Sequence, residues 1–146
     1  MKKVSLLRAL VVLALVFGAT ALGLAQSAVL TAETKALAAG GGTVTLAATA
    51  NYEGQPGALG WSIALPADWF LVSVSGPNPP GIAPEAGSAG TLEFAYFAIP
   101  ANRAEFKFVV RYPPGAATAK ATPTVLIRAN GKLVTLEPAA VAFGGN

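Results

Sequence analysis

The stretch that decides the fold is Glu105-Phe106-Lys107-Phe108-Val109-Val110-Arg111-Tyr112. Its even-numbered residues are all large and apolar, whereas three of its four odd-numbered residues are charged. Successive side chains of a β-strand point to opposite faces of the sheet. The alternation therefore predicts a strand with one face in the core and the other in water.

The same alternation, or a short apolar run, recurs on both sides of this stretch. We expect further strands over residues 44–50, 59–65, 69–75, 92–97, 124–128, 133–137 and 140–143. Asn130-Gly131 joins two of them and is the favoured pair for a two-residue type I′ hairpin turn. The sequence thus predicts an all-β fold, a single antiparallel β-sandwich of the immunoglobulin-like or jelly-roll type with about 7–9 strands.

The domain itself is expected to span residues 42–146. Residues 26–41 before it are interpreted as a flexible N-terminal segment or a first strand. Alanine and leucine over 29–39 would also permit a short helix, since both favour helices locally. We prefer the strand for this region.

The first 25 residues have the order of a secretory signal peptide, expected to be helical. Lys2, Lys3 and Arg8 form a basic head, and residues 9–25 carry no charge and end in small residues. We expect cleavage after Ala25 and export to the extracellular space, the cell surface or the periplasm. The alternative is a retained membrane anchor, although at about 1.5 Å per residue this run would barely cross a hydrocarbon core of about 30 Å.

The positive charge belongs to this leader. The whole chain has 10 basic and 7 acidic residues, and three of the basic ones lie within the first eight residues. The remaining chain is neutral and lacks the basic stripe that binding to phosphate backbones requires. We therefore expect no nucleic-acid partner, and contact with a membrane only through the leader before it is cleaved.

Two absences exclude most chemistry. The chain has no Cys and no His, which excludes disulfides, thiolate metal sites and catalysis that uses histidine as a base. Among the carboxylates, Glu93 and Glu105 fall in the polar phase of predicted strands, where an ion pair with Lys107 or Arg111 is the ordinary explanation. Asp68 fits a turn. We predict no catalytic residue, no metal site and no cofactor, and hence no enzyme.

Aromatic residues are the candidates for ligand binding. Tyr52, Trp69 and Tyr96 would form a platform on which sugar rings could stack if they are exposed. Trp61 falls in phase with apolar neighbours and is expected in the core, as a sandwich often buries one Trp between its sheets. Burial of all these rings is the competing interpretation.

Residues 76–90 form the longest stretch without a strand signal, rich in Pro and Gly. A loop of this length in a small domain is often functional. Its prolines reduce the entropy that docking would cost. The segment is either a docking loop or a crossover between the two sheets, and the two roles are compatible.

Several short motifs are shared with one class of secreted bacterial modules. They are Leu65-Pro66-Ala67-Asp68-Trp69, Pro84-Glu85-Ala86-Gly87 leading to Gly90-Thr91-Leu92-Glu93-Phe94, Phe106-Lys107-Phe108, and Pro113-Pro114-Gly115. Over residues 44–143 the chain resembles the cohesin-type and carbohydrate-binding-module-type sandwiches of extracellular multidomain proteins. The resemblance implies a β-sandwich. Cohesins bind dockerin partners on a sheet face, but the shared motifs are structural and transfer no binding residue to this chain.

These features together predict a secreted or cell-envelope module with an interaction or structural role. Its partner would be a protein or polysaccharide of the cell envelope or extracellular matrix. One alternative is a carbohydrate-binding module that uses exposed aromatic residues. Another is a subunit of a surface filament, in which an exposed strand edge pairs with a neighbouring molecule.

Overall fold

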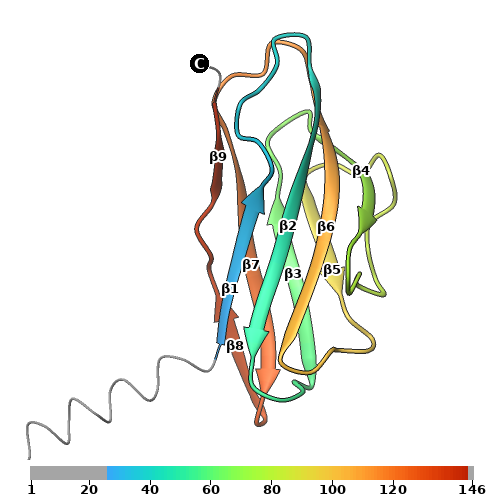
Figure 1. Cartoon of the computed structure of the whole chain (residues 1–146), viewed down its shortest axis with the longest axis vertical. Coiled ribbons are helices and arrows are strands. Elements are labelled where there is room, and N and C mark those ends of the chain that lie inside the picture. Colours follow the sequence, from blue (N-terminus) through green and yellow to red (C-terminus); the bar gives the residue numbers. More distant parts are fainter. Residues whose placement is uncertain (1–25, 145–146) are drawn as a thin grey trace, which may run out of the picture.

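The computed structural model describes residues 26–144, and this part of the chain folds into strands (Figure 1). The strands are β1 (Gln26–Ala32), β2 (Gly42–Tyr52), β3 (Ala58–Ala64), β4 (Phe70–Ser75), β5 (Thr91–Ala95), β6 (Arg103–Tyr112), β7 (Ala119–Ala129), β8 (Lys132–Leu136) and β9 (Val141–Phe143). The predicted leader lies outside the described residues. Residues 26–144 contain no helix with the length and apolar character needed to span a bilayer.

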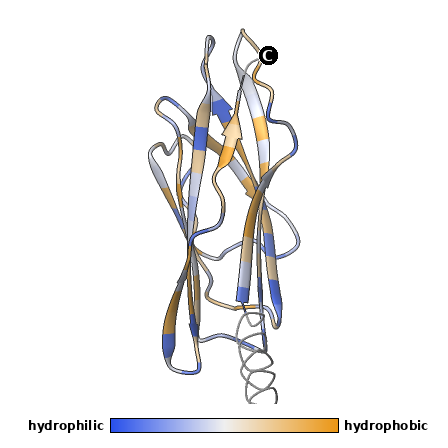
Figure 2. Cartoon of the chain, turned by 90° about the vertical axis from the view of Figure 1, so that its left-hand side faces the viewer, coloured by the Kyte–Doolittle hydropathy of each residue, from blue (hydrophilic) through white to orange (hydrophobic). Residues whose placement is uncertain are grey.

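The strands form two sheets that pack face to face. The first sheet has the order β1-β2-β6-β4, and the second has the order β5-β3-β7-β8, with β9 also pairing with β7. Every ladder between these strands is antiparallel. Seen edge-on, the sheets form two layers, and apolar and polar residues alternate along their ribbons (Figure 2). The prediction of a single antiparallel β-sandwich is confirmed.

Strand β6 has the expected orientation. Its residues alternate between buried and accessible over their whole length, with Phe106, Phe108 and Val110 fully buried. On one side β6 pairs with ten successive residues of β2, and on the other side it pairs with β4. This strand therefore fixes both the register of the first sheet and the face that it turns to the core.

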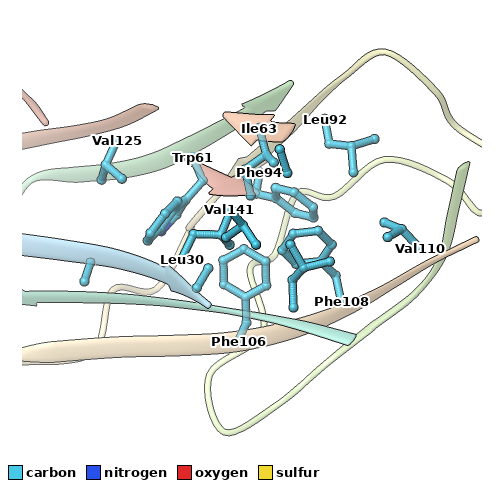
Figure 3. Close-up of a cluster of buried hydrophobic side chains, with 14 of the residues drawn as sticks. Leu30, Trp61, Ile63, Leu92, Phe94, Phe106, Phe108, Val110, Val125 and Val141 are labelled. Carbon is cyan, nitrogen blue, oxygen red and sulfur yellow. The ribbon is translucent and has the colours of Figure 1, made fainter. Parts of the chain in front are cut away.

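A cluster of aromatic rings joins the two sheets (Figure 3). The ring of Phe106, from the first sheet, lies 4.8 Å from that of Phe94 and 6.2 Å from that of Trp61, both from the second sheet. Phe108 also contacts Phe94, at 5.5 Å between ring centroids. Such tilted and edge-to-face pairs add about 0.5–1.5 kcal/mol each to the effect of burial. The middle of the sandwich is thus an aromatic core.

Residues 26–32 form a strand of the sandwich. All seven residues of β1 pair with β2 in one unbroken register, and Leu30 inserts into the core. The strand prediction is confirmed, but β1 begins and ends earlier than the predicted range 29–39, and the helical alternative is wrong. Pairing with β2 outweighs the local helix propensity of Ala and Leu. The sandwich thus includes residues 26–32, which the sequence allows as a first strand ahead of residue 42.

Strand β7 is longer than predicted, because it continues through Pro123. A central strand is hydrogen-bonded to a neighbour on each side, and proline has no N–H to donate to either of them. Here the second neighbour of β7 changes at that point, since β9 pairs with residues 119–121 and β8 with residues 125–129. The turn between β7 and β8 is as expected, with positive φ at both Asn130 (53°) and Gly131 (73°), as a type I′ turn requires.

Two phenylalanines give a matched test of this core. Phe106 is fully buried, whereas Phe97 is 79% exposed. We expect Phe106→Ala to lower the free energy of unfolding by about 3–5 kcal/mol, because it leaves a cavity between the sheets. Phe97→Ala should change it by no more than about 0.5 kcal/mol. Urea denaturation measures both, and similar losses in the two variants would contradict the assigned core.

Candidate interaction surface

Trp69 is buried at one end of the sandwich and is not exposed to a ligand. Its side chain is 1% exposed and packs between the rings of Tyr112 at 5.4 Å and Phe143 at 5.0 Å. A turn at Asp68, with φ of 66° and a hydrogen bond from the Trp69 amide to the Pro66 carbonyl, directs the indole inward. Trp69 thereby connects β6 to β9.

The two predicted tyrosines are also buried, and each uses its hydroxyl to hold a loop. Tyr52 donates to the carbonyl of Pro100 at 2.6 Å, and Tyr96 donates to the carbonyl of Asn78 at 2.6 Å. Burial raises the pKa of both hydroxyls, and the nearby Tyr52 contributes to the shift at Tyr96. Tyr52, Trp69 and Tyr96 therefore do not form the predicted platform, since a sugar needs an open ring face and these rings face the core.

The segment 76–90 crosses between the sheets and is attached along its length. The Asn78 amide donates to the carbonyl of Glu105, and Ile82 exchanges two hydrogen bonds of 2.9 Å with Ala95 of β5. Near its end the segment also bonds to Leu71 of β4 through Gly87 and Ser88. Of the two roles considered, the crossover is therefore observed, and the segment forms an ordered part of the surface.

The carboxylates lie on outer faces, as the strand phase predicted, but with other partners. Glu105 pairs with Arg103 at 3.0 Å, on the same face of β6, and not with Lys107 or Arg111. Glu93 accepts a hydrogen bond from the Ser62 hydroxyl at 2.8 Å. No group of three or more metal-ligating side chains gathers within the described residues. These two contacts give Glu93 and Glu105 a structural role.

The candidate binding surface is the outer face of the second sheet. Gly60 lies at its middle, opposite Ala95 on one side and Leu126 on the other. Because Gly60 has no side chain, a hollow of about 250 Å³ opens above it, lined also by Ser62, Thr124 and Ile82. Glu93 is the one charged residue in this lining.

Two exposed apolar side chains, Ile82 and Leu126, line this hollow, and two more lie next to them; we call the four the outer-face patch. Its four residues are Ile82, Phe97, Leu126 and Leu133, each at least 43% exposed. The ring of Phe97 lies so close to Gly81 that a Cβ there would come within 2.6 Å of it, which places this ring beside Ile82. Leu133 lies on the neighbouring strand, diagonal to Leu126. Exposed apolar groups clustered in this way mark interaction sites more often than scattered ones do.

The outer face of the first sheet has a different character. There β6 carries charged residues at four of its five outward positions, namely Arg103, Glu105, Lys107 and Arg111, with Val109 at the fifth. Charged residues are depleted from the centres of protein interfaces. The outer face of the second sheet also carries charge, since Arg128 lies opposite Leu133, and the first sheet exposes Phe70 and Val72 near its β4 edge. The central strand of the first sheet is the more highly charged, so we take the face of the second sheet as the candidate docking surface.

The sequence alone did not single out the outer-face patch, although a signal was present. Phe97 and Leu126 fall in the polar phase of their predicted strands, where a large apolar side chain is unusual. Ile82 gave no such signal, because it lies in the crossover and reaches the sheet only through its pairing with Ala95. That contact depends on the tertiary fold.

Comparison with known proteins supports the fold and no finer assignment. No protein family and no curated protein matches the chain. Among solved structures it is similar to the full-length major pilin SpaD from Corynebacterium diphtheriae, with a TM-score of 0.58 and 11% identity over 80% of this chain. It is also similar to a DUF4466 family protein from Parabacteroides merdae, with a TM-score of 0.49 and 12% identity over 82% of this chain.

The chain spans about a third of the pilin, 35% of its length, and 44% of the second protein. At this identity the likeness to the pilin concerns the β-sandwich architecture. The resemblance to cohesin-type and carbohydrate-binding modules is thus supported as far as an all-β sandwich, and no family model assigns the chain to either of them.

The buried Tyr96 hydroxyl predicts a loss of stability in alkali. Its pKa is raised in the folded protein, so the fold holds the proton more tightly than the unfolded chain does. The resulting stabilisation is complete below the ordinary tyrosine pKa of about 10 and is lost as the pH rises above it. We expect Tyr96→Phe to cost about 1 kcal/mol at neutral pH through the lost hydrogen bond, yet to make the alkaline decline shallower.

Denaturation curves at about pH 7 and about pH 11 measure both effects. The wild-type protein and the variant should differ less at the higher pH. An equal loss of stability between the two pH values in both proteins would show that the Tyr96 hydroxyl does not titrate as its burial requires.

Proposed function

We propose that the chain is an exported, non-catalytic β-sandwich module that binds a partner protein in the cell envelope or outside the cell. The observation that carries this proposal is the outer-face patch, four exposed apolar side chains of which two, Ile82 and Leu126, line the hollow at Gly60. A pocket of this kind accepts an apolar side chain of a partner, which is the usual centre of a protein interface.

A protein fits this surface better than a polysaccharide does. Sugars need flat aromatic faces flanked by hydrogen-bonding groups, and the aromatic residues first considered for that role, Tyr52, Trp69 and Tyr96, are buried. The outer-face patch is mostly aliphatic, and in the lining of its hollow the carboxylate of Glu93 is already bonded to Ser62. The patch offers apolar area and little capacity for hydrogen bonding.

The exported location rests on the leader, and the non-catalytic role rests on the lack of His and Cys in the sequence. The likeness in fold to part of a major pilin is compatible with a protein of the cell surface. A sandwich without disulfides or metal ligands can work in either an oxidising or a reducing compartment.

Photo-crosslinking in cells tests the location and the surface together. A photoreactive amino acid is placed at Leu126, or at the control position Thr43 on the outer face of the first sheet, in the whole 146-residue chain. We expect the protein recovered from the envelope or medium to begin at Gln26. The Leu126 probe should give a discrete product that contains peptides of a second protein, and the Thr43 probe should not.

Three results would contradict the proposal. They are an intact leader on protein that stays in the cytoplasm, equal crosslinking at both positions, and a product that contains polysaccharide in place of a protein. An intact leader on membrane-bound protein would instead support the retained anchor and correct the cleavage alone. A probe placed at Ser62, in the lining of the hollow, should crosslink to the same second protein. Adding Leu126→Glu to that variant should abolish the crosslinked product, because a charge at the rim of the hollow opposes an apolar partner.

A second candidate function is a subunit of a surface assembly built by pairing of strand edges. The observation that favours it is the composition of β1, an edge strand of seven residues that contains no charged residue, proline or glycine. Natural sheets protect most of their edges by such residues, because an unprotected edge pairs with other strands.

A further inference from the structure

The crossover segment 76–90 bonds to two of the four sheet edges. Along β4, the Leu71 amide donates to the Ser88 carbonyl at 2.8 Å, and the Gly87 amide donates to the Leu71 carbonyl at 2.7 Å. Along β5, Ile82 exchanges hydrogen bonds with Ala95. Both edges lie on the right-hand side of the molecule in Figure 1, and the segment occupies one end of each.

The third edge is protected by its sequence. Strands β8 and β9 lie along the same strand β7 and are separated by residues 137–140, which include Glu137 and Pro138. Lys132 begins β8. A break in the strand, a proline and charged side chains are devices that keep an edge from pairing.

The fourth edge, β1, lacks all of these devices. Its sequence is Gln26-Ser27-Ala28-Val29-Leu30-Thr31-Ala32, and its register with β2 has no bulge. Within the described residues β2 is the one strand that forms a ladder with it. Strand β9 lies close to β1 (Figure 1) but forms no ladder with it, and the bridge between Ala36 and Gly144 lies beyond the end of β1. The backbone groups on this side of β1 are therefore unpaired among the strands of residues 26–144.

The backbone phase shows which residues of β1 present hydrogen-bonding groups to this edge. Just after the strand, the Glu33 amide donates to the Thr45 carbonyl of β2 at 3.0 Å. In an antiparallel pair, successive residues direct their N–H and C=O groups to opposite sides. Odd-numbered residues of β1 therefore bond to β2, and Gln26, Ala28, Leu30 and Ala32 direct theirs outward.

The order of residues in β1 is self-complementary. We propose that β1 pairs with β1 of a second copy, antiparallel, about a two-fold axis at Val29, and this inference rests on the second candidate function. In that register Ala28 lies opposite Leu30 of the other copy, and Gln26 lies opposite Ala32. All four residues direct their N–H and C=O groups outward. By the two-fold symmetry each of these two pairings occurs twice, so four residue pairs form about two backbone hydrogen bonds each, about eight in total.

The side chains fit this register as well. Val29, which is 47% exposed, meets Val29 of the other copy on the outer face of the sheet. Ser27 lies opposite Thr31, a pair able to hydrogen-bond across strands. The residues of β2 beside this row, Ala47, Thr49 and Asn51, carry no charge, so no like charges meet. Registers centred on other residues leave part of the strand unpaired.

This pairing alone gives a closed dimer with a continuous sheet formed from the first sheets of both copies, and a larger surface assembly would need a further contact between such dimers. A two-fold interface uses the same patch on both copies and therefore ends the assembly at two. Pairing of one seven-residue strand buries less area than a standard protein interface does. We therefore expect a dimer that dissociates on dilution.

A cysteine crosslink tests the register, since the chain has no Cys of its own. At the two-fold axis Val29 forms a non-hydrogen-bonded pair with Cα atoms about 4.5 Å apart, which suits a disulfide. We expect Val29→Cys to become a disulfide-linked dimer under mild oxidation. Ser27→Cys and Thr31→Cys should each stay monomeric alone, and a mixture of the two should form crosslinked dimers.

Sedimentation of protein without cysteine provides the second measurement. We expect the mass to approach that of a dimer as the concentration rises towards about 1 mM. Val29→Lys should prevent this, whereas the matched variant Thr43→Lys, on the same face but away from the edge, should not.

The outcomes distinguish failure of the β1 pairing from failure of the surface-assembly function. A protein that stays monomeric throughout overturns both the inference and the surface-assembly function. A dimer or larger assembly that Val29→Cys does not trap, or that Val29→Lys does not prevent, overturns the β1 pairing alone. Neither result bears on partner binding at the outer-face patch, which lies on the other sheet.

Discussion

The contact between Phe106 of the first sheet and the aromatic rings of the second sheet is the interaction on which the fold depends. The chain has no cysteine to link its layers, so burial of apolar area has to hold them together. Many other inward positions carry alanine, which contributes little area. The aromatic cluster around Phe106, and Trp69 between Tyr112 and Phe143 at one end, supply most of the large side chains. The rings that looked like a binding platform are needed for the fold.

Because most of the aromatic side chains are buried in the core, the outer faces of the two sheets consist mainly of other residues. The first sheet has a row of charged residues on its outer face and an edge strand, β1, without charge or proline. The second sheet carries the outer-face patch, with Glu93 and Arg128 beside it. The crossover segment 76–90 contributes to this arrangement, because it bonds to one end of the edges of β4 and β5 and brings Ile82 beside the hollow at Gly60. A partner at the outer-face patch and a second copy at β1 would occupy separate surfaces of one molecule.

The alternation of apolar residues was sufficient to predict most of the fold, because burial of one face is a local property of a strand. Pairing choices were harder to predict. The passage of β7 through Pro123 depends on a change of neighbour, and the order of the segment 76–90 depends on Asn78 and Ile82 meeting distant strands. The predicted aromatic binding platform was wrong for a related reason. Trp69 lies just outside a strand, where alternation cannot assign its direction, and its burial is decided by Phe143, far along the chain.

Both tryptophans report directly on the central claim that the aromatic residues form the core. Trp61 and Trp69 are each 1% exposed, so neither indole contacts solvent. The decisive measurement is quenching of tryptophan fluorescence by iodide and acrylamide in the folded protein. We predict blue-shifted emission that neither quencher reduces appreciably until the protein is unfolded. Red-shifted emission that is readily quenched in the folded protein would contradict the core and would restore Trp69 as a surface residue.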